Sequence, residues 1–400
     1  MKVIGIVGEY NPFHFGHAYH IEESRKAAGE DSAVVCVMSG DFVQRGEAAL
    51  YSKFARAEAA CRSGVDLVLE LPLPWSLSSA EGFARGALGI LGNLGIVDTL
   101  SFGSECGSAD ALSRTAELLL KPETDERIRR ELKENEGISF AAARQRALAH
   151  FDGDLALLLE SPNNILGVEY IKAIYEQSLD ITPVTVMRLG AGHDAHGDAL
   201  PRSASEIRRR IKAKNDADGD IPAAALEVYE RERRLGRGPV FADALEIAAL
   251  SRLRMLPKEA FALLPDCGEG LSDRIAAAVS EESSLDAIAA AAKSKRYALS
   301  RIRRILMCAP LGVRKGAALD LPPYARVLAA NETGCRLLKE AKDKGRIPIL
   351  TKPAAVKSLG TESLKLFKLG SDAHDFYVLG YAAREERRGG TDWRQSPKIL

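Results

Sequence analysis

Short aliphatic and β-branched runs alternate with segments of helical periodicity through the first half of the chain. The runs that we predict to be strands are KVIGIV at the N-terminus, SAVVCVM (32–38), VDLVLEL (65–71), DTLSFG (98–103) and TPVTVMRL (182–189). Strands that are buried on both faces are continuous apolar runs, and their alternation with helices is typical of a doubly wound parallel sheet. We therefore predict an α/β domain with such a sheet over residues 1–215.

Serines stand at the start of several predicted helices. Ser52, Ser79 and Ser108 each precede a segment with apolar residues at helical spacing, and NNILGVEYIKAIYEQ (163–177) has the same periodicity. A serine hydroxyl at this position accepts a hydrogen bond from a free backbone N–H of the first turn. We expect these serines to cap the helices that separate the strands.

The pattern changes after the polar segment NDADGDIP (215–222), which we take as a domain boundary. Alanine- and leucine-rich helical segments such as ADALEIAALSRLRML follow, and RIPIL (346–350) is a short strand candidate near the end. We predict a mainly helical second half over residues 216–400, with a small mixed C-terminal piece.

Composition narrows the class of protein. The 55 basic and 55 acidic residues cancel, so contact with nucleic acid has to come from local basic patches. Six cysteines without a CxxC pair are typical of reduced thiols in the cytosol. The apolar run after Lys2 is too short for a signal peptide, and no stretch approaches the roughly 20 apolar residues of a membrane span. We expect a cytoplasmic protein with no membrane segment, and nothing in the sequence indicates an obligate protein partner.

The stretch EYNPFHFGHAYH (9–20) follows the first predicted strand and contains the motif HFGH, in which Gly16 separates His14 from His17. Ligands of open α/β sheets bind at the carboxyl ends of strands, where the free N–H groups of a helix N-terminus favour a phosphate. Gly16 lets the backbone approach such a ligand closely, and the two imidazoles can donate to phosphate oxygens. We interpret the motif as a nucleotide site.

Two other interpretations of the histidines remain. A zinc site would use His14, His17 and His20, but their spacing does not keep all three on one helix face, and we expect no metal site. HxGH by itself is more often a pair of structural histidines beside a turn. Its place after the first strand of the α/β pattern favours function.

A second motif, RSASEIRRRI (202–211), follows the last predicted strand. Ser203 and Ser205 precede a predicted helix, where they can cap it and bind phosphate oxygens. Arg208 lies one turn further and can donate two hydrogen bonds to the same anion. Alone, this is a capped basic surface helix; together with HFGH, it indicates transfer of a nucleotidyl group.

The two motifs together resemble the HxGH nucleotidyltransferase superfamily, and a longer run of segments resembles the bacterial tRNA(Met) cytidine acetate ligases. The segments are EYNPFHFGHAYH, MSGDFVQRGE, ELP, SAEGFA, FGSE, SPNNILGVEY, GAGH, SASEIR, KSKRYALSRIRRILM and DWRQSPKIL. The resemblance implies a Rossmann-like nucleotidyltransferase domain that uses ATP, with Mg²⁺, to convert acetate into acetyl-adenylate. The acetyl group then passes to the wobble cytidine of elongator tRNA(Met). The alternative is a small-molecule adenylyltransferase of the same superfamily.

The resemblance also implies the site residues. The ATP site comprises Val7, Gly8, Glu9, Tyr10, Asn11, Pro12, Phe13, His14, Phe15, Gly16, His17, His20, Gly103, Asn163, Arg188, Ser203, Ser205 and Arg208. The catalytic residues are His14 and His17 at the α-phosphate and Arg208 on pyrophosphate. Two residues depart from the family pattern, because Phe15 and Ala48 stand where Asn and Pro are common.

Two basic clusters are candidates for contact with tRNA. Their cations are Arg209, Arg210, Lys293, Lys295, Arg296, Arg301, Arg303 and Arg304. Tyr297 lies within the second cluster, and an aromatic ring there can stack on an unpaired base. Gln44 and Arg45 are candidates for binding acetate, although a structural loop explains them equally well.

Overall fold

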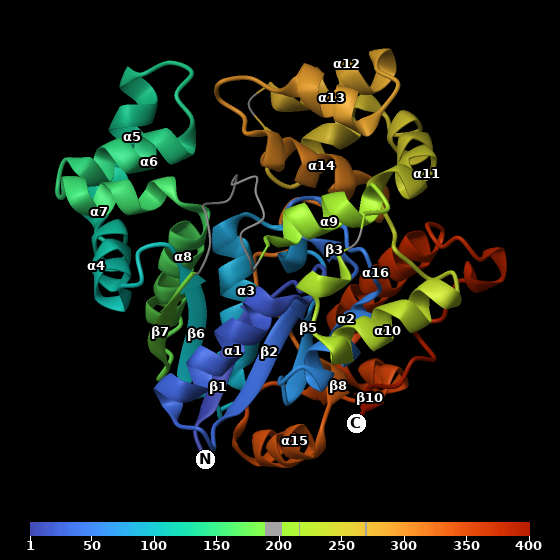
Figure 1. Ribbon diagram of the computed structural model, residues 1–400. Coiled ribbons are helices and arrows are strands. Elements are labelled where there is room, and N and C mark those ends of the chain that lie inside the picture. Colours follow the sequence, from blue (N-terminus) through green and yellow to red (C-terminus); the bar gives the residue numbers. More distant parts are fainter. Residues whose placement is uncertain (189–201, 216, 269) are drawn as a thin grey trace.

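The computed structural model of the chain describes residues 1–188, 202–215, 217–268 and 270–400 (Figure 1). Its centre is a sheet in which five strands run parallel in the order β5, β2, β1, β6, β7. These strands are β1 (Val3–Gly8), β2 (Ala33–Ser39), β5 (Leu67–Leu71), β6 (Thr99–Ser104) and β7 (Thr182–Met187). All five predicted strands are present, and the doubly wound parallel sheet is confirmed.

Helices cover both faces of this sheet because its strands are apolar on both sides. In β2, Val34, Cys36 and Met38 point into one core, and Val35 and Val37 into the other. The first core is closed by α1 (Phe15–Ala28), α2 (Lys53–Arg62) and α10 (Ala223–Arg234). The second is closed by α3 (Ala80–Asn93), α8 (Pro162–Glu176) and α15 (Glu332–Lys344).

The expected serine caps are confirmed. The hydroxyl oxygens of Ser52, Ser79 and Ser108 accept hydrogen bonds from the backbone N–H groups of Ala55, Gly82 and Ala111 at 3.3, 3.4 and 3.2 Å.

The C-terminal piece returns to the same sheet, which the sequence did not lead us to expect. Strand β8 (Ala325–Ala330) pairs antiparallel with β5, and β9 (Ile349–Leu350) and β10 (Lys398–Ile399) pair with β8. The division of the chain near residue 215 stays a prediction, but Ile221 and Tyr229 beyond it are buried in the same core as Phe13.

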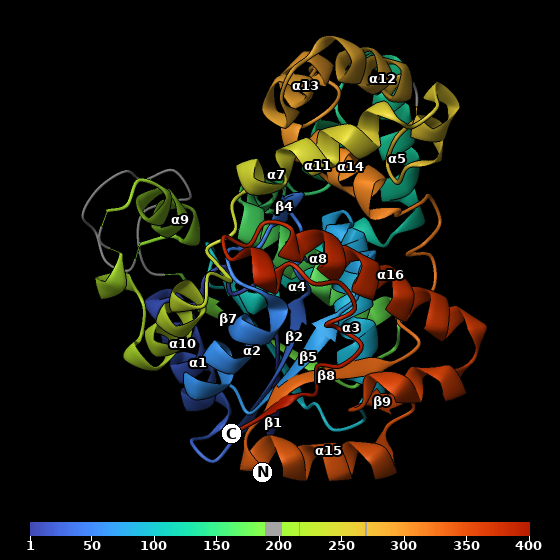
Figure 2. The ribbon, with the colours of Figure 1, turned by 90° about the vertical axis from the view of Figure 1, so that its right-hand side faces the viewer.

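Two groups of helices stand above the carboxyl edge of the sheet (Figures 1 and 2). The first contains α5 (Pro122–Glu134), α6 (Phe140–Ala149) and α7 (Gly153–Leu157); α4 (Ala109–Leu119) leads into it and packs in the second core with α8. The second, which we call the helical lobe, contains α11 (Ala242–Arg254), α12 (Leu271–Glu281), α13 (Leu285–Ala292) and α14 (Leu299–Leu311). This lobe lies within the expected helical half, whose helices α10 and α15 cover the sheet instead.

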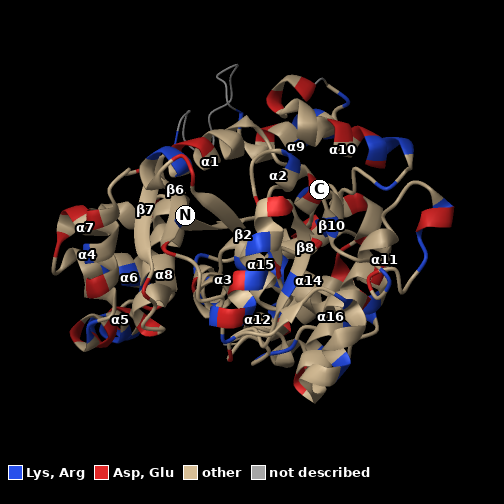
Figure 3. Cartoon of the chain, turned by 90° about the horizontal axis from the view of Figure 1, so that it is seen from below, with Lys and Arg blue, Asp and Glu red and all other residues tan. Residues whose placement is uncertain are grey.

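Acidic and basic residues are interspersed along the elements drawn in Figure 3, as the balanced composition leads one to expect. Within the described ranges, no helix is long and apolar enough to cross a membrane.

Candidate active site at the carboxyl edge of the sheet

The chain order of the strands reverses between β1 and β6, and a doubly wound sheet forms its ligand crevice at such a point. The loop from Glu9 to His14 leaves β1 here and leads into α1. Tyr10 adopts a positive φ of 47°, and its buried ring meets the ring of His17 edge-on at 4.9 Å. The Phe13 N–H donates to the hydroxyl of Tyr229 at 2.9 Å. The rings of Tyr10 and Phe13, 5.0 Å apart between centroids, are buried in the first core and anchor the loop to it.

His14 and His17 cap the start of α1 reciprocally. The Nδ1 atom of His14 accepts from the N–H of Gly16 at 3.0 Å, and the Nδ1 atom of His17 accepts from the N–H of His14 at 3.2 Å. A neutral imidazole that accepts at Nδ1 carries its proton on Nε2. The two rings, 3.8 Å apart between centroids, therefore each hold an Nε2–H donor at the helix N-terminus.

The histidines of this site are neutral at physiological pH. Burial, with the positive charges of Arg188 and Arg208, lowers the pKa of His14 to about 3. Burial, with His14 and Arg188, holds the pKa of His17 well below its ordinary value. An uncharged N–H donor can bind a phosphate oxygen without adding a buried charge to the site.

His20 faces the sheet. Its Nε2 atom lies 3.0 Å from the hydroxyl of Ser101 on β6, which in turn lies 2.6 Å from the hydroxyl of Ser24. Burial and Arg188 lower the pKa of His20 to about 4. These contacts of His20 join α1 to β6. Its contact with ATP stays a prediction.

Arg188 follows β7 and crosses the end of β6. A Cβ atom at Gly103 would lie 3.3 Å from the Cγ atom of Arg188, so the glycine leaves room for this side chain. The backbone N–H of Arg188 donates to Ser104 at 3.0 Å. The positive charge of Arg188 contributes to the lowered pKa of His14, His17 and His20.

The second motif forms α9 (Ala204–Lys212), above the loop that follows β1 (Figure 1). Ser203 is its N-cap and accepts from the N–H of Glu206 at 3.3 Å, as predicted. Ser205 lies within the first turn rather than before it, and its hydroxyl accepts from Arg208 at 3.2 Å. Arg208 also donates to the carbonyl oxygen of Asn11 at 3.0 Å. The two motifs are therefore in direct contact.

Asn163 stands at the start of α8, beside the end of β6. Its side-chain amide donates to Glu105 Oε1 at 2.6 Å, and the side chain of Asn164 accepts from the N–H of Glu105 at 3.0 Å. The segments FGSE and PNNILG therefore meet, although they lie far apart in the sequence.

The sequence analysis missed Arg56 on α2. Its guanidinium is fully buried and donates to the carbonyl oxygens of Glu9, Ser39, Gly40 and Tyr51. It thereby ties the loop after β1 to the loop after β2. An arginine between alanines in KFARAEAACR was the only sign of this role.

The expected stacking of Tyr297 on a base is wrong. Its ring is only 4% exposed and packs in the core of the helical lobe. The guanidinium groups of Arg296 and Arg301 lie 5.9 and 5.2 Å from the ring centroid, and Arg301 also donates to the carbonyl oxygen of Asp266. Lys293, Lys295 and Arg296 remain exposed.

The part of the chain that the structure describes adds neither a metal site nor the GAGH segment to this site. Among the residues that the structure describes, no group of three or more His, Cys, Asp and Glu side chains is arranged to hold a metal ion. The segment GAGH (190–193), which belongs to the sequence resemblance, lies outside the described residues.

Known proteins resemble the chain along its length. The HIGH Nucleotidyl Transferase family model matches residues 1–392. The tRNA(Met) cytidine acetate ligase of Acetivibrio thermocellus is 37% identical over 100% of both chains. That of Caldanaerobacter subterraneus subsp. tengcongensis is 40% identical over 95% of this chain and 96% of the relative. The crystal structure of Thermotoga maritima TmcAL bound with alpha-thio ATP has a TM-score of 0.94 at 34% identity, over 100% of both chains.

Proposed function

The chain belongs to the HIGH nucleotidyl transferase family and, within it, to the tRNA(Met) cytidine acetate ligases, and we propose that it performs their reaction. It is an ATP-dependent ligase that activates acetate as acetyl-adenylate and acetylates the wobble cytidine of elongator tRNA(Met). The observation that supports this most directly is the pair of neutral Nε2–H donors on His14 and His17. The positive charge of Arg188 acts on both rings, and that of Arg208 on His14.

The first step is an in-line displacement at phosphorus. A carboxylate oxygen of acetate attacks the α-phosphorus, the bond to the bridging oxygen breaks, and pyrophosphate leaves. His14 and His17 donate to oxygens of the α-phosphate as negative charge develops. Arg208, with the hydroxyls of Ser203 and Ser205, binds the leaving pyrophosphate.

The second step transfers the acetyl group. The exocyclic amine of the cytidine attacks the carbonyl carbon of acetyl-adenylate, and the bond between that carbon and the phosphate oxygen breaks. AMP leaves, and the amine releases one proton to solvent.

Mg²⁺ accompanies the nucleotide in this proposal. Mg²⁺ is commonly held by substrate phosphates with one or two carboxylates, so it needs no protein cage. Glu9 accepts a hydrogen bond from the N–H of Gln44, and Glu47 is attracted to Arg208 at 3.8 Å, which fits an ion carried by the phosphates. When bound, the ion neutralises part of the phosphate charge.

The tRNA is bound, in this proposal, by cations above the carboxyl edge of the sheet. Lys293, Lys295 and Arg296 are exposed at the helical lobe, and Arg209 is exposed on α9. Arg210, Arg301, Arg303 and Arg304 belong to the same two clusters. Such a substrate also supports a location in the cytoplasm.

Release of pyrophosphate from ATP and Mg²⁺, with and without acetate and in the absence of RNA, tests the first step. We expect release to depend on acetate. Labelled acetate should then enter elongator tRNA(Met), but not a transcript whose wobble cytidine is replaced by uridine. Release that ignores acetate but responds to a small-molecule acceptor such as phosphopantetheine would instead favour an adenylyltransferase.

A further inference from the structure

The short hairpin after β2 contacts both halves of the molecule. Its strands are β3 (Phe42–Val43) and β4 (Glu47–Ala48). On the side of the ATP site, the N–H of Gln44 donates to Glu9 Oε1 at 2.7 Å. The N–H of Leu50 donates to Asn11 Oδ1 at 2.8 Å. Both acceptors belong to the loop that we assign to ATP.

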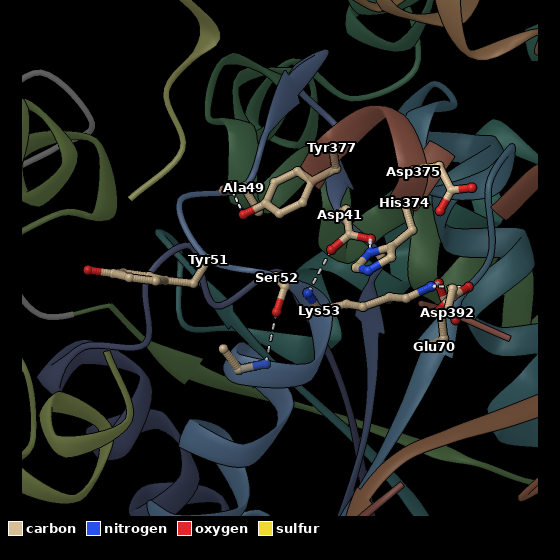
Figure 4. A network of polar contacts seen from close by, with 12 residues as sticks. Asp41, Ala49, Tyr51, Ser52, Lys53, Glu70, His374, Asp375, Tyr377 and Asp392 are labelled. Atoms are coloured by element: carbon tan, nitrogen blue, oxygen red, sulfur yellow. Dashed lines mark hydrogen bonds and ion pairs between the residues drawn. The ribbon is translucent and has the colours of Figure 1, made fainter. Parts of the chain in front are cut away.

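The other side of the hairpin is held by the C-terminal half. The hydroxyl of Tyr377 donates to the carbonyl oxygen of Ala49 at 2.9 Å, and His374 Nδ1 lies 2.8 Å from Asp41 Oδ2 (Figure 4). Gly46, with a φ of +78°, touches α14 so closely that a Cβ atom would lie 2.5 Å from the backbone of Arg303. The hairpin is therefore fixed against α14 of the helical lobe and against the segment that carries His374 and Tyr377.

Glu47, on β4, lies between two arginines, one of which we assign to pyrophosphate and the other to tRNA. Its Oε2 atom is 3.8 Å from Arg208, and its Oε1 atom is 3.7 Å from Arg303 on α14. Both distances exceed hydrogen-bond length, so the carboxylate is attracted to both guanidinium groups without being bonded to either. The hydrogen bonds of Arg208 itself go to uncharged acceptors, Asn11 and Ser205.

We propose that Glu47 is a positioning residue that couples binding of tRNA at Arg303 to binding of pyrophosphate at Arg208. This inference rests on the proposed function. An RNA phosphate on Arg303 replaces its ion pairs with Glu47 and Asp286. Glu47 then opposes the charge of Arg208 more fully, and pyrophosphate binds less tightly. Binding of tRNA thereby favours departure of pyrophosphate, and the coupling acts equally in the reverse direction.

Affinity for pyrophosphate, measured by calorimetry on the full chain without acetate or RNA, tests the ion pairs. We expect Glu47→Gln to lower the dissociation constant about two- to fivefold, because exposed ion pairs contribute little energy. Arg303→Gln should raise it about twofold in the wild-type background and much less in Glu47→Gln. Lys295→Gln removes one exposed cation of the same cluster and controls for the general loss of charge. Equal effects of Arg303→Gln in both backgrounds would overturn the coupling.

Addition of elongator tRNA(Met) tests the consequence. It should raise the dissociation constant of pyrophosphate about twofold in the wild type and in Arg303→Lys, but not in Glu47→Gln. An equal response in Glu47→Gln overturns the role of Glu47, even when acetate-dependent pyrophosphate release is normal. If that release is absent while the coupling of Glu47 and Arg303 is intact, the proposed function fails and the ion-pair exchange stands.

Discussion

His17 is the clearest test of the neutral-donor arrangement at the helix N-terminus. We expect His17→Ala to lower kcat for acetate-dependent pyrophosphate release by about 10²- to 10³-fold, the usual effect of removing one donor to a developing negative charge. His17→Gln should recover part of the rate, because its amide can donate from a similar position. Single-turnover kinetics give the rates, and far-UV circular dichroism checks the fold. Wild-type rates in His17→Ala would contradict the assignment.

Arg208 and Arg209 are adjacent on α9 and form a matched pair. Arg208 contacts Asn11 and Ser205, whereas the side chain of Arg209 is 66% exposed and pairs with Glu206. We expect Arg208→Gln to lower pyrophosphate release by about 10²-fold, because its charge-assisted bonds to the leaving group are lost. Arg209→Gln should leave the release without RNA within about twofold, since an exposed pair contributes little.

The same measurement separates local chemistry from overall charge. Equal losses in Arg208→Gln and Arg209→Gln would mean that only the net charge of α9 matters.

The positions of these residues could be predicted because they follow from local rules, while their roles stay predictions. A motif directly after a parallel strand must lie at the ligand edge, and a serine before a helical segment must stand at its N-terminus. Arg56 follows no such rule. Its role depends on carbonyl groups that four separate residues bring to it in space.

Among the elements, β8 shows why the C-terminal piece was not predicted to join the sheet. ARVLAA contains three alanines and one β-branched residue, a composition with no preference for a strand. Pairing with β5 and burial of all six residues determine its conformation. Tyr297 is a similar case, because only the packing of the helical lobe shows that its ring is buried.

The contact between the hairpin and α16 (Thr361–Val378) depends on pH. Burial alone would lower the pKa of His374, but Asp41 and Asp392 outweigh it and raise that pKa, with Lys53 opposing them. The folded protein therefore holds this proton more tightly than the unfolded chain. Its contribution to stability is complete below the ordinary histidine pKa and is lost as the pH rises through the folded value.

We expect the stability advantage of the wild type over His374→Asn to be larger at pH 6 than at pH 9. Urea unfolding at both pH values measures it. The low pKa values of His14 and His17 have the opposite effect, lost as the pH falls, but they occur in both proteins and cancel. Exposed His150→Asn is the control. An advantage that grows towards pH 9 would mean that His374 is neutral in the folded protein.

At the scale of the whole molecule, a buried ionic network joins the N-terminal and C-terminal halves of the chain (Figure 4). Lys53 Nζ lies 2.8 Å from Glu70 and 3.1 Å from Asp392. Arg326 lies 2.8 Å from Asp392 and 3.2 Å from Glu70. All four side chains are at most 9% exposed. Each carboxylate therefore depends on cations from both halves, a dependence that no local pattern in the sequence reveals.

A fragment of residues 1–215 tests this dependence. It keeps Lys53 and Glu70 but lacks Arg326, Asp392 and the strand that pairs with β5. Breaking a buried ion pair costs about 3–5 kcal/mol, a large share of the roughly 5–15 kcal/mol that stabilises a typical protein. We expect the fragment to lack a cooperative urea transition and a native near-UV circular dichroism spectrum.

Full-length Asp392→Asn controls for the loss of the helical lobe, because it weakens the network while every helix and strand remains. It should unfold cooperatively, but at a lower urea concentration than the wild type. If the fragment instead unfolds cooperatively at the wild-type midpoint and binds ATP, the network does not hold the sheet together. Residue 215 would then be a true domain boundary, with β8 and β10 only added to a sheet that is already stable.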